Sequence, residues 1–78
     1  MKEFYYIKRD MIDDNTFHLY ASANISNPTA RYHISAIHID FMRDLLIDCD
    51  SDFKDAILTM NEEMMAKVRI NIEEVDFV

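Results

Sequence analysis

The longest run of residues with a single hydrophobic period extends from Asn27 to Cys49. Its apolar side chains recur every three or four residues, which is the period of one face of a helix. Asn27 can cap such a helix, and Pro28 then occupies the first helical position, where its missing N–H costs nothing. The pattern predicts a long central helix with one buried face. That face consists of Ala30, Ile34, Ile37, Phe41 and Leu45.

The same stretch permits a second interpretation, in which residues 31–39 form a strand and a short helix follows. The alternation that a strand needs is broken there. Tyr32 and Ile34 fall on one face, whereas Ile37 and Ile39 fall on the other. The helix is therefore the preferred interpretation, and the strand is the alternative.

Three further segments have the character of strands. Glu3–Arg9 is aromatic or β-branched on both faces, and Thr16–Ser22 alternates between apolar and polar residues. The aspartate-rich residues between them suit a turn, so the two segments are expected to form an antiparallel hairpin. Lys67–Glu73 predicts a third strand. The alternation changes parity after it, which indicates either a bulge near Glu73–Glu74 or the end of the strand.

A second helix is expected between the central helix and the last strand. Ser51 can cap it, Asp52 lies in its first turn, and it is expected to end near Met65. Its apolar face consists of Phe53, Ala56, Ile57, Met60 and Met64. The predicted order is ββααβ. It describes a small single α+β domain, residues 1–78, with a three-stranded antiparallel sheet packed against two helices.

Composition adds the expected cellular setting. The chain has 78 residues and is half hydrophobic, so it is globular but near the lower size limit for a self-sufficient core. Its single cysteine, Cys49, allows no internal disulfide, which suits a reducing compartment. No apolar run reaches the roughly 20 residues that span a bilayer. A cytoplasmic protein is expected, in the host cytoplasm if it is phage-encoded. Glycine is absent, which excludes phosphate-binding glycine loops, and no cofactor is expected.

The net charge of −7 is segregated along the chain. Residues 1–38 hold four acids and four bases, whereas residues 39–78 hold eleven acids and four bases. Asp40, Asp44 and Asp48 are spaced by four on the predicted central helix, where like charges repel each other, so folding alone does not explain them. The predicted partner-binding residues are Asp40, Asp44, Asp48, Asp50, Asp52, Asp55, Glu62 and Glu63.

The residues that resemble catalytic or metal sites each have a structural interpretation. Residues 48–52 begin like a calcium-binding loop, but Phe53 replaces the required glycine and Thr59 replaces the bidentate glutamate. The histidines and the cysteine do not have the spacing of zinc ligands. His38 and Cys49 are interpreted instead as buried core residues. No metal site and no enzymatic activity are expected.

The outer face of the predicted sheet could combine aromatic and basic side chains. Such faces can stack single-stranded bases, but a strongly acidic protein is poorly suited to bind phosphates. Direct nucleic-acid binding is therefore not expected, and the sheet is predicted to be a scaffold. The residues that could share this face are Tyr5, Ile7, His18, Tyr20, Lys67 and Arg69.

These features predict a non-enzymatic inhibitor that binds a basic, nucleic-acid-binding protein and presents carboxylates in place of phosphates. Proteins of this kind include phage-encoded anti-defence or anti-CRISPR inhibitors and the immunity proteins of nuclease toxins. The alternative is a self-associating structural or regulatory module, such as a homodimer, because the chain has more apolar side chains than a small core needs. The surplus side chains are Met60, Met64, Met65, Val75 and Phe77.

Overall fold

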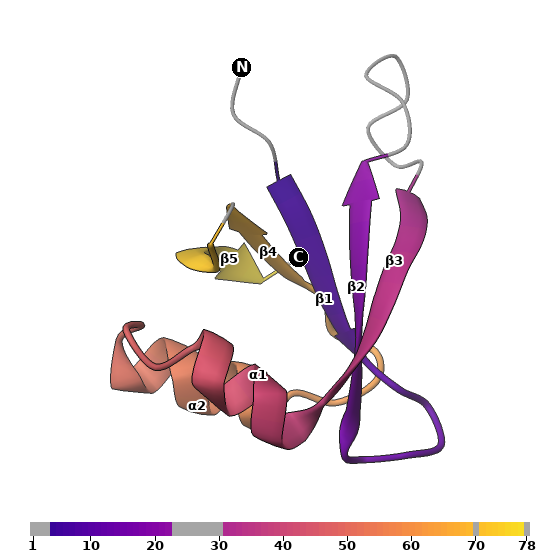
Figure 1. Cartoon of the computed structure of the whole chain (residues 1–78), viewed down its shortest axis with the longest axis horizontal. Coiled ribbons are helices and arrows are strands. Elements are labelled where there is room, and N and C mark those ends of the chain that lie inside the picture. Colours follow the sequence, from indigo (N-terminus) through magenta and orange to yellow (C-terminus); the bar gives the residue numbers. More distant parts are fainter. Residues whose placement is uncertain (1–3, 23–30, 70, 78) are drawn as a thin grey trace.

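The computed structural model describes residues 4–22, 31–69 and 71–77. These residues form five strands and two helices. In chain order they are β1 (Phe4–Arg9), β2 (Thr16–Ser22), β3 (Arg31–His38), α1 (Ile39–Leu45), α2 (Ser51–Thr59), β4 (Ala66–Arg69) and β5 (Glu73–Phe77). The strands form one antiparallel sheet in the order β3-β2-β1-β4-β5, and the helices lie together across one end of it (Figure 1). The predicted α+β class is confirmed, but the three-stranded ββααβ arrangement is wrong.

The first half of the predicted central helix is strand β3. Its register against β2 shifts after Leu19, which leaves Ile34 as an extra residue in a β-bulge. A bulge changes the parity of the alternation, so Tyr32 and Ile37 lie on the same face although they are five residues apart. The bulge is the reason why this segment looks too irregular for a strand, and the alternative interpretation of residues 31–39 is the correct one.

Helix α1 is therefore short, and its buried face differs from the predicted one. Met42 and the C-cap residue Leu46 are fully buried, whereas Phe41 is 56% exposed and Leu45 is half-buried. The prediction that Phe41 lies on the buried face is wrong. Helix α1 begins only after β3, and the side chains that it buries are Met42 and Leu46. The predicted cap at Asn27 lies outside the described residues.

Helix α2 begins as expected but ends earlier. Asp50 is its N-cap in place of Ser51, and Asp52 lies in its first turn as predicted. The helix ends at Thr59, and the C-cap Met60 is buried, so the predicted end near Met65 is wrong. Neither helix in the described part of the chain is long and apolar enough to cross a membrane.

The predicted last strand, Lys67–Glu73, ends early as β4 at Arg69, and a second strand, β5, follows from Glu73. The backbone reverses at Asn71 and Ile72, whose φ angles are 65° and 56°. Positive φ is unfavourable for a β-branched residue such as Ile72, and glycine is the residue that adopts it most easily. The chain contains no glycine, so this turn is formed by asparagine and isoleucine. The register of β5 also shifts by one residue against β4, so the predicted irregularity near Glu73–Glu74 is present, after a turn that was not predicted.

The predicted turn between β1 and β2 is held by its aspartates. Asp13 Oδ1 accepts the backbone N–H of Asn15 at 2.9 Å, and Asp13 Oδ2 accepts the hydroxyl of Thr16 at 2.9 Å. These two hydrogen bonds lower the pKa of Asp13 from its ordinary value. The hairpin has the predicted end residues Arg9 and Thr16, because its signals are local.

The hydrophobic core lies between the helices and one face of the sheet, which we call the inner face. Cross-strand pairing places Ile7 between Leu19 and Ala66 on this face. The buried core cluster consists of Ile7, Phe17, Ile37, Met42, Leu46, Ile57, Met60, Ala66 and Val68. Tyr5 and Leu19 pack against this cluster without being fully buried.

Candidate functional site

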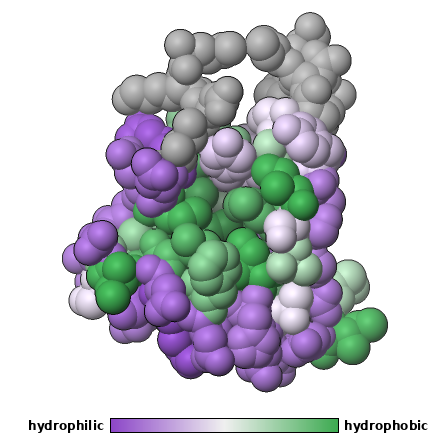
Figure 2. All heavy atoms as spheres, in the orientation of Figure 1, coloured by the Kyte–Doolittle hydropathy of each residue, from purple (hydrophilic) through white to green (hydrophobic). Residues whose placement is uncertain are grey.

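The predicted carboxylates all lie on the helices and their connecting segments, and all are exposed. Residues 39–65 contain only two bases, Arg43 and Lys54. Figure 2 shows hydrophilic side chains along the part of the molecule where the helices lie. We call the set of predicted carboxylates the acidic helical surface. It consists of Asp40, Asp44, Asp48, Asp50, Asp52, Asp55, Glu62 and Glu63.

Two of these carboxylates have evident roles in folding. Asp40 forms an ion pair with Arg43, with 3.0 Å between Oδ1 and Nη1. Asp50 caps α2, because its Oδ2 accepts the backbone N–H of Asp52 at 3.0 Å. The backbone N–H of Asp50 donates to the carboxylate of Glu74, which links this turn to β5.

Asp44 and Asp48 have no such role. The predicted row of three aspartates on one helix is wrong, because α1 ends at Leu45 and Asp48 lies beyond it in the turn before α2. Asp44 is in the last turn of α1, where the helix dipole disfavours an anion. Within the described residues, neither carboxylate forms an ion pair or a hydrogen bond.

The outer face of the sheet, opposite the helices, carries part of the predicted aromatic and basic set. Tyr20, Lys67 and His18 share it, because Tyr6 of β1 pairs with Tyr20 and with Lys67 and the next outer position on β2 is His18. Ile7 pairs with core residues, so it lies on the inner face, and the prediction for it is wrong. Tyr5 shares its error, since alternate residues of a strand share a face.

Cations lie over two of the rings on this outer face, Phe4 and Tyr6. The Lys67 ammonium and the Arg69 guanidinium lie 4.2 and 5.8 Å from the centre of the Phe4 ring. The guanidinium of Arg31 lies 4.0 Å from the centre of the Tyr6 ring. Cation–π contacts hold these positive charges against the sheet. They also occupy ring faces on which nucleic-acid bases would have to stack.

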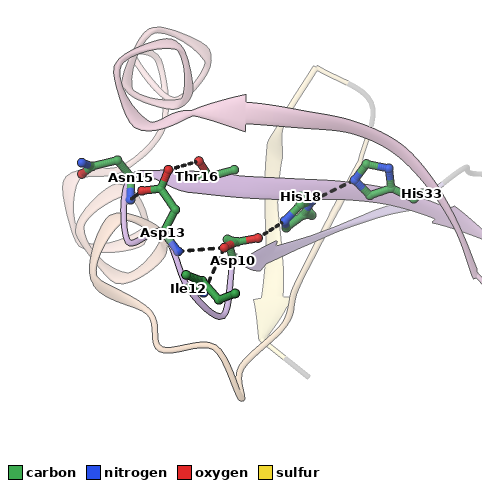
Figure 3. Close-up of polar contacts among 7 residues, drawn as sticks. All are labelled: Asp10, Ile12, Asp13, Asn15, Thr16, His18 and His33. Atoms are coloured by element: carbon green, nitrogen blue, oxygen red, sulfur yellow. Dashed lines mark hydrogen bonds and ion pairs between the residues drawn. The ribbon is translucent and has the colours of Figure 1, made fainter.

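A hydrogen-bonded network joins the turn after β1 to β2 and β3 (Figure 3). His18 Nε2 is 2.6 Å from Asp10 Oδ1, and His18 Nδ1 is 2.8 Å from His33 Nε2. Asp10 Oδ2 also accepts the backbone N–H groups of Ile12 and Asp13, at 2.9 and 2.8 Å. The Asp13 N–H, then the His18 imidazole and the Ile12 N–H, lower the pKa of Asp10 from 3.8 to about 2.

The network has a defined proton requirement. One ring of the pair must donate and the other accept, so the bond between His18 and His33 needs at least one neutral imidazole. The Tyr20 ring packs edge-on against His33, with 5.3 Å between ring centres. Among the described residues no hydroxyl or thiol hydrogen-bonds to His33, and the Ser35 hydroxyl donates to the Ala36 carbonyl instead. The geometry fits a link between strands more closely than an activated nucleophile.

Sequence reasoning missed this network because it is not local. If residues 31–38 are taken as a helix, His33 has only His38 as a neighbouring histidine in the sequence. The signal becomes visible once residues 31–38 are paired with β2, because Tyr20 then stands opposite His33 and His18 is nearby.

The remaining predicted chemistry residues have structural positions. His38 is exposed and caps α1, accepting the Asp40 N–H at 3.2 Å, so its prediction as a core residue is wrong. Cys49 is half-buried and its Sγ donates to the Ile72 carbonyl at 3.0 Å. Burial, then the carboxylates of Glu74 and Asp48, raise the pKa of the thiol. Among the described residues, no three His, Cys, Asp or Glu side chains are grouped to hold a metal ion.

No protein-family model matches this chain, and neither a curated protein nor a solved structure matches it.

The Asp10 carboxylate should make stability depend on pH in acid. The pKa of Asp10 in the folded protein, about 2, is below the ordinary value of 3.8. Its contribution to the free energy of unfolding is therefore fully present above pH 3.8 and is lost as the pH falls to about 2. The difference in unfolding free energy between the wild type and Asp10→Asn should therefore narrow across this window. Urea unfolding followed by circular dichroism at several pH values measures it. If the difference in unfolding free energy between the two proteins stayed constant between pH 3.8 and about pH 2, the lowered pKa of Asp10 would be wrong.

Proposed function

We propose that this protein is a non-enzymatic inhibitor that uses the acidic helical surface to bind a basic, nucleic-acid-binding protein. The observation that supports this most is the exposure of eight carboxylates in a stretch with only two bases. Asp44 and Asp48 are the most informative pair, because folding gives no reason for them. Surfaces that retain locally unfavourable charge are typical of binding sites for a partner of opposite charge.

Exposed apolar side chains on the same segment support a protein partner. Phe41 is 56% exposed and follows Asp40, and Ile47 is 70% exposed and precedes Asp48. A purely solubilising surface has no need for large apolar groups, whereas interfaces combine a few apolar anchors with a polar rim. Phe41 and Ile47 are the apolar anchors in this proposal, and each is next to an aspartate in the sequence.

The mechanism is competition. A cleft that binds nucleic acid is lined with Lys and Arg side chains that contact phosphates. Carboxylates held on two packed helices can pair with those bases and exclude the nucleic acid. Met42, Leu46 and Ile57 are fully buried beneath the helices, which keeps the charges in a fixed arrangement and reduces the entropy lost on binding.

The test is affinity capture from a nuclease-treated bacterial lysate on immobilised protein, followed by mass spectrometry. The wild type should retain a nucleic-acid-binding protein at low salt and release it at high salt. Asp44→Lys with Asp48→Lys should abolish capture. The matched control, Asp14→Lys with Asp76→Lys, makes the same charge change outside the helices and should retain capture.

Two outcomes would overturn the proposal. One is capture that is insensitive to salt or that yields no nucleic-acid-binding protein. The other is a folded Asp44→Lys, Asp48→Lys variant that captures the same protein as the wild type. When a partner is recovered, adding the inhibitor should displace a labelled oligonucleotide from it, and Phe41→Ala should weaken that displacement without changing the fold.

A further inference from the structure

The two edges of the sheet carry opposite charges. β3 is one edge and contains one arginine, two histidines and no acid, and β5 is the other edge and contains three acids and no base. Within the described residues no strand lies beyond either edge. Arg31 is the permanent cation of β3, which also contains His33 and His38, and the acidic residues of β5 are Glu73, Glu74 and Asp76.

Cross-strand pairing places one polar residue of each edge on the same face. One row of paired residues crosses all five strands on the outer face: His33, Tyr20, Tyr6, Lys67 and Asp76. The row begins with the His33 imidazole on β3 and ends with the Asp76 carboxylate on β5. If a second copy extended the sheet, the carboxylate at the end of one row would meet the imidazole at the start of the next, and these groups can form a hydrogen bond.

A second pair fits the same register. Arg31 is two residues before His33, and Glu73 is three residues before Asp76. The extra residue of β5 lies at its register shift, so Glu73 and Asp76 are two strand positions apart. The alignment that places Asp76 beside His33 therefore also places Glu73 beside Arg31.

Within the described residues, few features protect the β3 edge from pairing with another strand. It is eight residues long and contains no lysine, proline or acid, which are the usual devices against strand pairing. Tyr32 is 55% exposed and Ile34 is 43% exposed. Its protection is the bulge at Ile34, which lies beyond the segment 31–33 that would pair with β5.

We propose that copies of this chain associate head to tail, with β5 of one copy pairing with β3 of the next. All neighbouring strands are antiparallel in a five-strand order, so β3 and β5 run in the same direction. A copy that keeps the outer face continuous must therefore pair in parallel. Such an interface does not close on itself, so it propagates into short open chains. The paired segment is short, which makes the association reversible and dependent on concentration.

This self-association uses different residues from the inhibitor function and can be tested separately by sedimentation velocity over a range of concentrations. The β3-edge variant is Tyr32→Asp with Ile34→Asp. The β5-edge variant is Glu73→Lys with Asp76→Lys. The wild type should form species that grow with concentration, and each edge variant should remain a monomer with a wild-type circular dichroism spectrum.

The decisive measurement is an equal mixture of the two variants. The β3-edge variant keeps an intact β5, and the β5-edge variant keeps an intact β3. The mixture should form a dimer of twice the monomer mass and nothing larger. Matched controls make equivalent changes away from both edges and should associate like the wild type: Met11→Asp with Ile12→Asp, and Glu62→Lys with Glu63→Lys.

Four results would overturn the proposal. The first is a wild type that stays monomeric at every concentration. The second is a β5-edge variant that still dimerises alone, which would indicate pairing of β3 with itself. The third is a mixture with no dimer. The fourth is loss of association in the Glu62→Lys, Glu63→Lys control, which would indicate that the acidic helical surface mediates it. Both edge variants should still capture the basic partner, so failure of either proposal is recognisable by itself.

Discussion

Replacing Leu46 with alanine should lower the free energy of unfolding by about 2–5 kcal/mol, whereas Phe41→Ala should change it by no more than about 0.5 kcal/mol. Leu46 is fully buried at the end of α1, within the same core cluster as Met42 and Ile57. Its truncation removes apolar contacts and leaves a cavity in a core that is small to begin with. The Phe41 ring is mostly in water, so its loss removes little packing.

Urea unfolding of both variants at one pH measures the contrast. For a chain of this size the loss at Leu46 is a large share of the total stability, so partial unfolding without denaturant is also expected. Leu45→Ala should fall between the two, because Leu45 is half-buried. If Phe41→Ala proved more damaging than Leu46→Ala, the helix would bury the face that its simple periodicity suggests, and the orientation of α1 described above would be wrong.

The elements that could be predicted from the sequence are those specified by local signals. The β1–β2 hairpin and the start of α2 were predictable because alternation, turn aspartates and capping residues are all local signals. The central segment has an apparent helical period because one bulge residue, Ile34, interrupts the two-residue period of the strand, so the prediction of a helix there is wrong. Only the pairing with β2, which is not encoded locally, reveals the bulge.

The prediction of the last strand is wrong for a related reason. Without glycine, the chain turns at Asn71 and Ile72, and an isoleucine inside an alternating stretch gives no sign of a turn. The sheet consequently gains β5 as an edge, and the charge of that edge could not be recognised from the sequence. Exposure of the acidic set was easier to predict, because unpaired carboxylates are almost never buried.

Replacing Arg9 with methionine should lower the free energy of unfolding by about 1.5–3 kcal/mol, the usual worth of a hydrogen bond that involves a charged group. The Arg9 guanidinium donates to the carbonyl of Leu58 and lies 5.0 Å from the centre of the Phe17 ring. The Leu58 carbonyl is in the last turn of α2, where backbone acceptors have no partner within the helix. Helix α2 has no basic residue in that turn, so Arg9 of β1 supplies the cation from the sheet.

Methionine keeps the apolar stem of the side chain, so the loss reports on the guanidinium and not on packing. Arg9→Lys should recover only part of it, because an ammonium lacks the planar fork that can contact the carbonyl and the ring together. Lys8→Met, on the opposite face of β1, is the matched control and should have a small effect. If Arg9→Lys were as stable as the wild type, a point charge near the end of α2 would suffice. If Arg9→Met were also unchanged, the contact between sheet and helix would contribute nothing, and core packing alone would hold α2 in place.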